Sequence, residues 1–201
     1  MSARSPIRTT RGQPVRRALR PTAEPWTCLS RSVSQTEQLG RVLGTAAQGG
    51  EVVALCGDLG AGKTALVRGL ARGLGADPAS VCSPTFVFIH EYAGHHRLAH
   101  ADLYRIEQRD EVLHLGLSDY EDPSTVLAVE WAERAGDLLP DDRLTVELHH
   151  VAPTVRRLTF RATGSTAARL LAAVRQVGQR AADVPSARRT PRLVASNKRR
   201  R

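Results

Sequence analysis

The octapeptide from Gly57 to Thr64, GDLGAGKT, decides how this chain folds. It matches G-x-x-x-x-G-K-[S/T] at each fixed position and lies between an apolar run, residues 52–56, and a helical pattern over residues 63–74. Glycines in such a loop let backbone N–H groups turn inward onto phosphates, and the N-terminus of the next helix adds partial positive charge. The stretch therefore predicts a strand, a phosphate-binding loop and a helix, in that order.

Lysine and threonine supply the chemistry of this loop. Lys63 is expected to reach the β- and γ-phosphates of a nucleotide, and the Thr64 hydroxyl is expected to bind Mg²⁺. The chain holds 29 lysine and arginine residues, of which only Lys63 and Lys198 are lysines. A lysine thus stands where the motif requires a compact ammonium that a guanidinium does not replace. The other nucleotide contacts of the loop are assigned to Asp58, Leu59, Gly60, Ala61 and Gly62.

Strand-like and helical patterns alternate on either side of the loop. The predicted strands cover residues 52–56, 86–92, 97–102, 126–130, 144–150 and 156–162, and the predicted helices cover residues 34–46, 63–74, 107–115 and 165–177. The first helix is expected to begin with a capping box, Ser34-Gln35-Thr36-Glu37. This alternation predicts an α/β fold, with a P-loop NTPase-type sheet flanked by helices on both faces in a single domain.

Charge divides the chain into three parts. Residues 1–25 carry six arginines and one acid, residues 178–201 carry eight basic residues and one acid, and residues 26–177 carry 15 basic and 18 acidic residues. Such basic runs are typical of disordered arms. We therefore expect disordered tails over 1–25 and 178–201 around a folded domain over 26–177. The tails could contact tRNA by counterion release, whereas the acidic domain gives no sign of an RNA-binding surface.

The apolar runs and the cysteines of the sequence predict a cytoplasmic protein. Its apolar runs fall short of the ~18 residues of a membrane span, and residues 1–20 lack the apolar segment of a secretory signal. Cys28, Cys56 and Cys82 are odd in number and are not at metal or redox spacing. They are therefore expected to be reduced thiols.

Two acids compete to complete the site. A phosphate loop needs an acid to hold or orient Mg²⁺ and a group to position the attacking water. Glu130 ends the most apolar strand, which places it at the carboxyl edge of the sheet, where α/β proteins bind ligands. We assign Glu130 as the residue that binds Mg²⁺, directly or through water. Asp102, which ends an alternating strand, is assigned as the general base or the residue that orients the attacking water. From the residues alone the two roles are exchangeable.

Other candidates have a structural and a functional interpretation. Trp131 either stacks on adenine or packs in the domain. The hydroxyls of Ser83 and Thr85 either sense the γ-phosphate or belong to a turn around Pro84. His100 is either a proton shuttle or a core histidine.

Together these residues resemble the TsaE family, small P-loop ATPases required for the N6-threonylcarbamoyladenosine modification of bacterial tRNA. The resemblance runs from about Ser34 to Ala162. It rests on an ordered set of five motifs: GDLGAGKT (57–64), SPT (83–85), HADLYR (100–105), GLSDY (116–120) and VEW (129–131).

The resemblance implies an ATP- and Mg²⁺-dependent ATPase that docks on the TsaD–TsaB pair and resets that complex between turnovers. Matched residue by residue, it implies phosphate and metal contacts at Lys63 and Thr64, a metal ligand at Glu130, a catalytic acid residue at Asp102 and a nucleotide contact at Trp131. We therefore assign catalytic roles to Lys63, Asp102 and Glu130.

Further nucleotide contacts follow from the same resemblance. It places residues 32–36 near the adenine, which makes Thr36 a candidate, and it places another nucleotide contact within residues 154–157. We also count Ser83 and Thr85 among the nucleotide-binding candidates.

Alternative activities remain to be weighed. A nucleotide-gated adaptor that binds TsaD–TsaB in its ATP state with little hydrolysis is the main rival, although intact Asp102 and Glu130 favour hydrolysis. A small-molecule kinase would need a long lid insertion after residues 63–74, and this chain has none there. A guanine-reading Asn-Lys-x-Asp motif is also missing, since the Asn-Lys pair of residues 197–200 is followed by two arginines.

Overall fold

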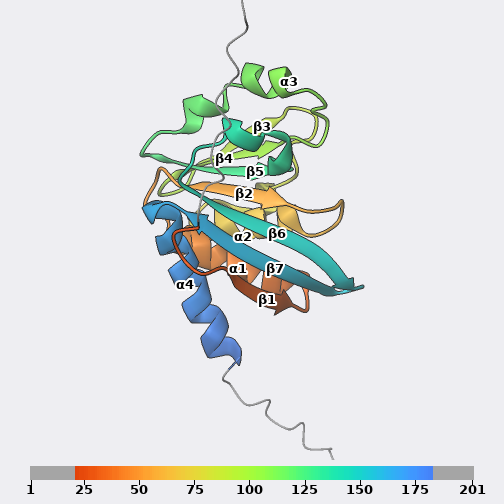
Figure 1. Cartoon of the computed structure of the whole chain (residues 1–201), viewed down its shortest axis with the longest axis vertical. Coiled ribbons are helices and arrows are strands. Elements are labelled where there is room, and N and C mark those ends of the chain that lie inside the picture. The colour runs from red at the N-terminus through yellow and green to blue at the C-terminus, as the bar shows by residue number, and fades with distance from the viewer. Residues whose placement is uncertain (1–20, 183–201) are drawn as a thin grey trace, which may run out of the picture.

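The structure, a computed structural model, describes residues 21–182, which form one seven-stranded sheet with helices on both faces (Figure 1). The strands are β1 (Trp26–Ser30), β2 (Val52–Cys56), β3 (Ile89–Tyr92), β4 (Arg97–Asp102), β5 (Thr125–Glu130), β6 (Arg143–Ala152) and β7 (Val155–Thr163). The α-helices are α1 (Val33–Ala46), α2 (Lys63–Gly73), α3 (Arg109–His114) and α4 (Ser165–Ala182). Four short 3₁₀ helices are η1 (Pro78–Ser80), η2 (Leu117–Tyr120), η3 (Ala132–Arg134) and η4 (Gly136–Leu138).

The strand order, β1-β7-β6-β2-β5-β4-β3, brings the ends of the central strands together. Strands β6, β2, β5 and β4 are parallel neighbours, and β7, β1 and β3 extend the sheet in antiparallel fashion. Parallel strands end at one edge of a sheet, which is where ligands bind in α/β folds. Cys56, Asp102 and Glu130 all end strands at this edge, and Asp102 is paired with Glu130 in register.

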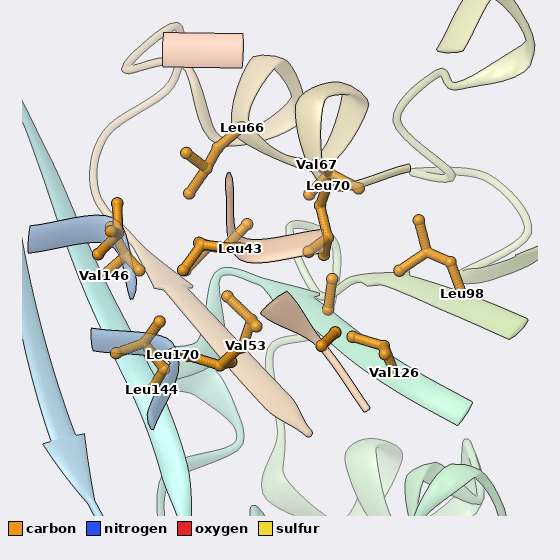
Figure 2. Packing of buried hydrophobic residues seen from close by; sticks show 14 of the residues in the cluster. Leu43, Val53, Leu66, Val67, Leu70, Leu98, Val126, Leu144, Val146 and Leu170 are labelled. Atoms are coloured by element: carbon orange, nitrogen blue, oxygen red, sulfur yellow. The ribbon is translucent and has the colours of Figure 1, made fainter. Parts of the chain in front are cut away.

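Helices α1, α2 and α4 cover one face of the sheet with a continuous apolar core (Figure 2). The buried side chains labelled there are Leu43, Val53, Leu66, Val67, Leu70, Leu98, Val126, Leu144, Val146 and Leu170. Burying each such leucine or valine stabilises the fold by about 1.5–3 kcal/mol. This packing fixes α2 on β2, and therefore fixes the loop that joins them.

The opposite face is only half covered. Apolar residues of β2, β5 and β4 pack here against α3, η2, η3 and η4. Leu127 and Val129, for example, belong to the same buried cluster as Val112 of α3. Strands β6 and β7 instead present polar side chains on this face, including the Glu147–Arg161 ion pair at 3.2 Å. The predicted α/β class is confirmed, and the alternating sequences of β6 and β7 reflect their one exposed face.

Two glycines let α1 and α2 touch through their backbones. A Cβ atom at Gly40 would lie 2.0 Å from the Leu66 carbonyl oxygen, and one at Gly69 would lie 1.9 Å from the Glu37 carbonyl oxygen. Side chains at these positions would push the helices apart. Small residues here thus hold α2, and the loop before it, close to α1.

The N-cap of helix α1 lies two residues earlier than predicted, at Ser32. The Ser32 hydroxyl accepts a hydrogen bond from the Gln35 N–H at 3.2 Å, and the Gln35 side chain accepts one from the Arg31 N–H at 2.7 Å. The predicted capping box at Ser34 was therefore wrong, because an equivalent serine two residues upstream caps the helix. The edge strand β1, which ends at Ser30, was not predicted.

At both ends the described chain reaches past the charge boundaries expected at residues 25 and 178. The Thr22 N–H donates to the Ala162 carbonyl oxygen at 2.9 Å, and α4 continues to Ala182. The rest of the predicted tails, 1–20 and 183–201, lies outside the described residues. Among the helices of residues 21–182, none has the length and apolar content needed to cross a membrane.

Candidate phosphate-binding site at the carboxyl edge of the sheet

The loop between β2 and α2 has the backbone that its glycines predict. Gly57, Gly60 and Gly62 have φ angles of 133°, 74° and 106°, a region that side chains rarely adopt. At Gly57 a Cβ atom would also lie 2.2 Å from the Leu148 carbonyl oxygen on β6. The loop therefore requires glycine at this point. Asp58, Leu59 and Gly60 are exposed along its outer side, and Ala61 is buried beneath it.

Lys63 lies at the centre of the loop and is 4% exposed. Its Nζ donates to the carbonyl oxygens of Gly57 at 2.5 Å and of Asp58 at 2.9 Å, and lies 3.8 Å from the centroid of the Trp131 ring. Burial lowers the pKa of the Lys63 ammonium, and the nearby carboxylates of Glu130 and Glu133 partly oppose this shift. The cation is thus held by loop carbonyls and an aromatic face, at the position from which a phosphate would be bound.

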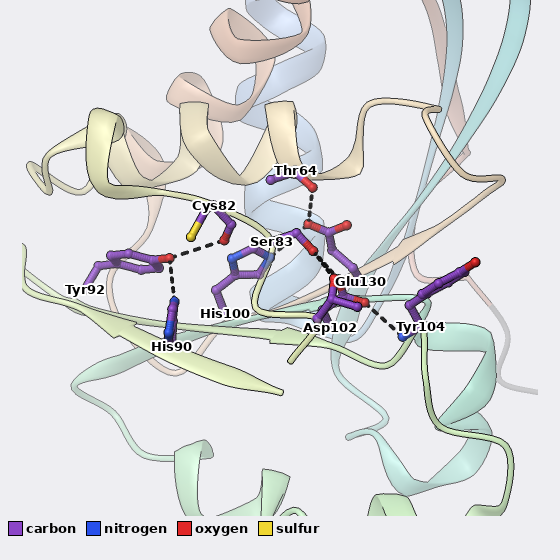
Figure 3. Close-up of polar contacts among 10 residues, drawn as sticks. Thr64, Cys82, Ser83, His90, Tyr92, His100, Asp102, Tyr104 and Glu130 are labelled. Carbon is purple, nitrogen blue, oxygen red and sulfur yellow. Dashed lines mark hydrogen bonds and ion pairs between the residues drawn. The ribbon is translucent and has the colours of Figure 1, made fainter. Parts of the chain in front are cut away.

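Thr64 and Glu130 come together although 66 residues separate them in sequence. The Thr64 hydroxyl donates to Glu130 Oε1 at 2.8 Å (Figure 3). Glu130 is 3% exposed, so this carboxylate is buried where α2 begins. A hydroxyl and a carboxylate are hard oxygen donors of the kind that Mg²⁺ prefers. These two residues fit the metal expected from the sequence.

Asp102 is bonded to the segment that follows η1. Its Oδ2 accepts hydrogen bonds from the hydroxyls of Ser83 and of Thr85, the latter at 2.8 Å, and its Oδ1 accepts from the Tyr104 N–H at 2.9 Å. Ser83 and Thr85, predicted as nucleotide contacts, therefore engage Asp102 in this structure. Figure 3 shows the bond from Ser83. This link was not predicted from the sequence.

Trp131 follows Glu130 in a left-handed conformation, with φ 57°. This turn brings its ring over Lys63 and beside Tyr104, with 5.1 Å between the two aromatic centroids. The Arg134 guanidinium lies 5.6 Å from the same indole. The Trp131 ring thus lies at the phosphate loop and also packs against the second apolar cluster.

Thr36 lies against the start of α2. A Cβ atom at Gly62 would be 3.9 Å from the Thr36 methyl group, so Thr36 borders the loop. Its hydroxyl is buried and hydrogen-bonded to the Ser30 hydroxyl at 2.8 Å. The hydroxyl of this nucleotide-binding candidate is thus engaged by the neighbouring strand.

Three further residues reach the site through strand pairing, of which His100 and a residue of segment 154–157 were candidates from the sequence. His100 Nε2 lies 2.9 Å from Glu130 Oε1. Arg156, within the predicted segment 154–157, donates to the Gly60 carbonyl oxygen at 3.4 Å, and the His150 ring would touch a Cβ atom placed at Gly60 at 3.8 Å. The β6–β7 pairing that sets His150 opposite Arg156 brings both to the loop, a long-range contact that leaves no local signal in the sequence.

The family model for "Threonylcarbamoyl adenosine biosynthesis protein TsaE" matches residues 30–158, which include the phosphate loop, Asp102 and Glu130. The chain belongs to the TsaE family. The resemblance inferred from the five motifs is therefore confirmed, over nearly the same residues.

Relatives of this TsaE chain come from several bacteria. The protein named "tRNA threonylcarbamoyladenosine biosynthesis protein TsaE" from Treponema pallidum is 37% identical over 132 residues, which cover 66% of this chain and 97% of that protein. A protein of the same name from Bacillus subtilis is 40% identical over 65% of this chain and 82% of its own length. Among solved structures, Bacillus subtilis YdiB superposes with a TM-score of 0.64 at 30% identity, over 77% of this chain and 96% of that one.

Proposed function

We propose that this TsaE protein binds ATP with Mg²⁺ at the loop of residues 57–64. The observation that supports it most is the convergence of Lys63, Thr64 and Glu130 at the carboxyl edge of the sheet. Lys63 would pair with the β- and γ-phosphates, and Thr64 and Glu130 would hold the metal. When bound, Mg²⁺ would neutralise phosphate charge as the terminal phosphoryl group is transferred to water.

Asp102 is the residue proposed to orient the attacking water. The division of roles that the sequence left open is supported by the contacts of each acid, because Glu130, not Asp102, bonds the loop threonine. Asp102 stands beside Glu130 in the β4–β5 pairing and accepts hydrogen bonds from the hydroxyls of Ser83 and Thr85. A carboxylate so placed can accept a proton from water without taking part in metal binding.

The biological role follows from the family. The named relatives belong to tRNA threonylcarbamoyladenosine biosynthesis, and we propose that this chain serves the same pathway. As the resemblance implies, ATP hydrolysis would act on the TsaD–TsaB complex to support or reset its turnover. Contact of the basic tails with tRNA remains a separate proposal, since most of their residues lie outside the described part of the chain.

One observation favours the adaptor alternative. Phe86 and Val87, next to Thr85, are 83% and 57% exposed, which is unusual for large apolar side chains. Because Thr85 is bonded to Asp102, a partner docked on Phe86 and Val87 would sense the state of the site. Such a surface suits nucleotide-gated binding of a partner, as the adaptor alternative requires.

Nucleotide binding is tested by calorimetric titration of the full chain with ATP, with and without Mg²⁺. Lys63→Ala is expected to abolish tight binding, because it removes the cation of the loop. Lys198→Ala, which changes the other lysine of the chain, is the matched control and should bind as the wild type does. Equal ATP affinity in the Lys63→Ala variant would refute the proposed site.

A further inference from the structure

His100 is a fully buried histidine that touches the proposed metal ligand. The side chain is 0% exposed, and its Nε2 lies 2.9 Å from Glu130 Oε1. The same oxygen accepts the Thr64 hydroxyl at 2.8 Å. In Figure 3 the imidazole lies between Tyr92 and the Glu130 carboxylate. Side chains from two elements, α2 and β4, therefore contact the same oxygen of Glu130, Oε1.

The chemistry of the two groups determines which of them donates the hydrogen bond. An ionised carboxylate only accepts hydrogen bonds, so Nε2 carries the proton and donates to Glu130. The other ring nitrogen, Nδ1, is buried and lacks a hydrogen-bond partner among the described residues. A buried polar atom without a partner costs about 1–3 kcal/mol. An apolar side chain of similar size would fill the same space without that cost, so packing alone does not explain a histidine here.

Strand register explains how His100 reaches Glu130. His100 pairs with Ala128 and Asp102 pairs with Glu130, so His100 is the diagonal neighbour of Glu130 across β4 and β5. Residues two apart in a strand point to the same face. Strand β4 thus sends both His100 and Asp102 toward the start of α2. Asp102 engages Ser83 and Thr85, whereas His100 engages Glu130.

We propose that His100 is a positioning residue that holds Glu130 for Mg²⁺. This inference rests on the proposed MgATP site. The two bonds to Oε1 fix the orientation of the carboxylate, and neither of them uses Oε2, which is left for the metal or a metal-bound water. Without His100, the carboxylate would keep one of its two donors and would sample other orientations, so Mg²⁺ would bind more weakly.

The test is a Mg²⁺ titration of the binding of a fluorescent ATP analogue, N-methylanthraniloyl-ATP, to the full chain. In His100→Phe, which keeps a ring but loses the donor, the Mg²⁺ concentration for half-maximal binding should rise at least tenfold. Binding at saturating Mg²⁺ should remain within about threefold of wild type. His100→Gln should restore the wild-type Mg²⁺ requirement to within about threefold, because its terminal amide nitrogen can lie where Nε2 lies.

Two further variants separate positioning from folding. His90→Phe changes a histidine of β3 that contacts Tyr92, and it should leave the Mg²⁺ requirement unchanged. His100→Asn, whose amide is too short to reach Glu130, should behave as His100→Phe does, which covers the case in which the larger ring prevents folding. Thermal unfolding of each variant identifies the folded proteins. If neither Phe nor Asn yields a folded protein, His100 is a structural residue and the proposal is overturned.

The outcomes distinguish this proposal from the function on which it rests. If wild-type binding of the analogue does not depend on Mg²⁺, the proposed metal site fails, and the positioning role fails with it. If wild type depends on Mg²⁺ but folded His100→Phe and His100→Asn keep the same dependence, only the role of His100 is overturned. An equal shift in the Gln and Phe variants would also overturn it.

Discussion

Replacing Asp102 with asparagine separates the chemistry of this residue from its structural contacts. The Asp102 carboxylate, 2% exposed, accepts hydrogen bonds from the Ser83 and Thr85 hydroxyls and from the Tyr104 N–H. In Asp102→Asn the amide oxygen can still accept from Tyr104, and the amide nitrogen can donate to the hydroxyls, since a hydroxyl both donates and accepts. Asp102→Ala removes all three bonds.

The expected magnitudes follow from these bonds. Hydrogen bonds to a charged group contribute about 1.5–3 kcal/mol each, and partly exposed partners recover some of this from water. Asp102→Ala should therefore lower the free energy of unfolding by about 2–4 kcal/mol, and Asp102→Asn by less than ~1 kcal/mol. A positioned general base accelerates a reaction by about 10²–10⁴-fold. Asp102→Asn should thus lower kcat for ATP hydrolysis at least ~100-fold and leave the Kd for MgATP within about threefold.

Single-turnover hydrolysis, calorimetric ATP binding and urea unfolding measure the three quantities on one protein preparation. Asp141→Asn, which removes an exposed acid in the turn before β6, is the matched control and should match the wild type in all three. Wild-type hydrolysis by Asp102→Asn would refute the role of Asp102. If Glu130→Gln then lost hydrolysis but kept Mg²⁺-dependent binding, the roles of the two acids would be exchanged.

Three other predictions concern separate parts of the molecule. Glu130→Gln should raise the Mg²⁺ concentration needed for half-maximal ATP binding by at least the tenfold (~1.4 kcal/mol) expected for His100→Phe, in a calorimetric titration; an unchanged requirement would exclude Glu130 from the metal site. Gly69→Ala should lower the free energy of unfolding in urea by about 1–3 kcal/mol, because the added methyl group meets the backbone of α1, although helix propensity alone predicts a gain of about 1 kcal/mol. Burial raises the pKa of the Cys28 thiol to about 11. Burial, with a smaller effect of the nearby Glu133, raises the pKa of the Cys56 thiol to about 12. Both thiols therefore stay protonated at pH 8. Iodoacetamide should therefore label exposed Cys82 first, as peptide mass spectrometry would show, and earlier labelling of Cys56 would contradict the structure.

The sequence was sufficient to predict the parts of the site that local pattern and parallel topology determine. The glycine spacing of residues 57–64 defines the loop conformation, and this loop is bounded by the predicted strand and helix. Asp102 and Glu130 each end a strand, and parallel strands end at one edge, so their location at that edge could be inferred without knowing the strand order. Their proximity depends on the pairing of β4 with β5.

What the sequence did not predict depends on register and on competition between equivalent residues. Ser32 and Ser34 both carry a hydroxyl suited to capping α1, and only the folded chain selects Ser32. The contact of His100 with Glu130 depends on which residue of β4 lies opposite which residue of β5. Arg156 reaches Gly60 only because β6 and β7 form a long hairpin beside the loop. The contacts of His100 and Arg156 are long-range and leave no local periodicity in the sequence, whereas the choice between Ser32 and Ser34 is local.

Steady-state ATP hydrolysis by the purified chain, alone and with the TsaD–TsaB pair proposed as its partner, tests the proposed function most directly. Lys63→Ala serves as the blank, because that variant should not bind MgATP. We predict Mg²⁺-dependent hydrolysis that the TsaD–TsaB pair stimulates and that Lys63→Ala abolishes. ATP-dependent association with TsaD–TsaB without hydrolysis above the blank would contradict the ATPase and identify the chain as a nucleotide-gated adaptor.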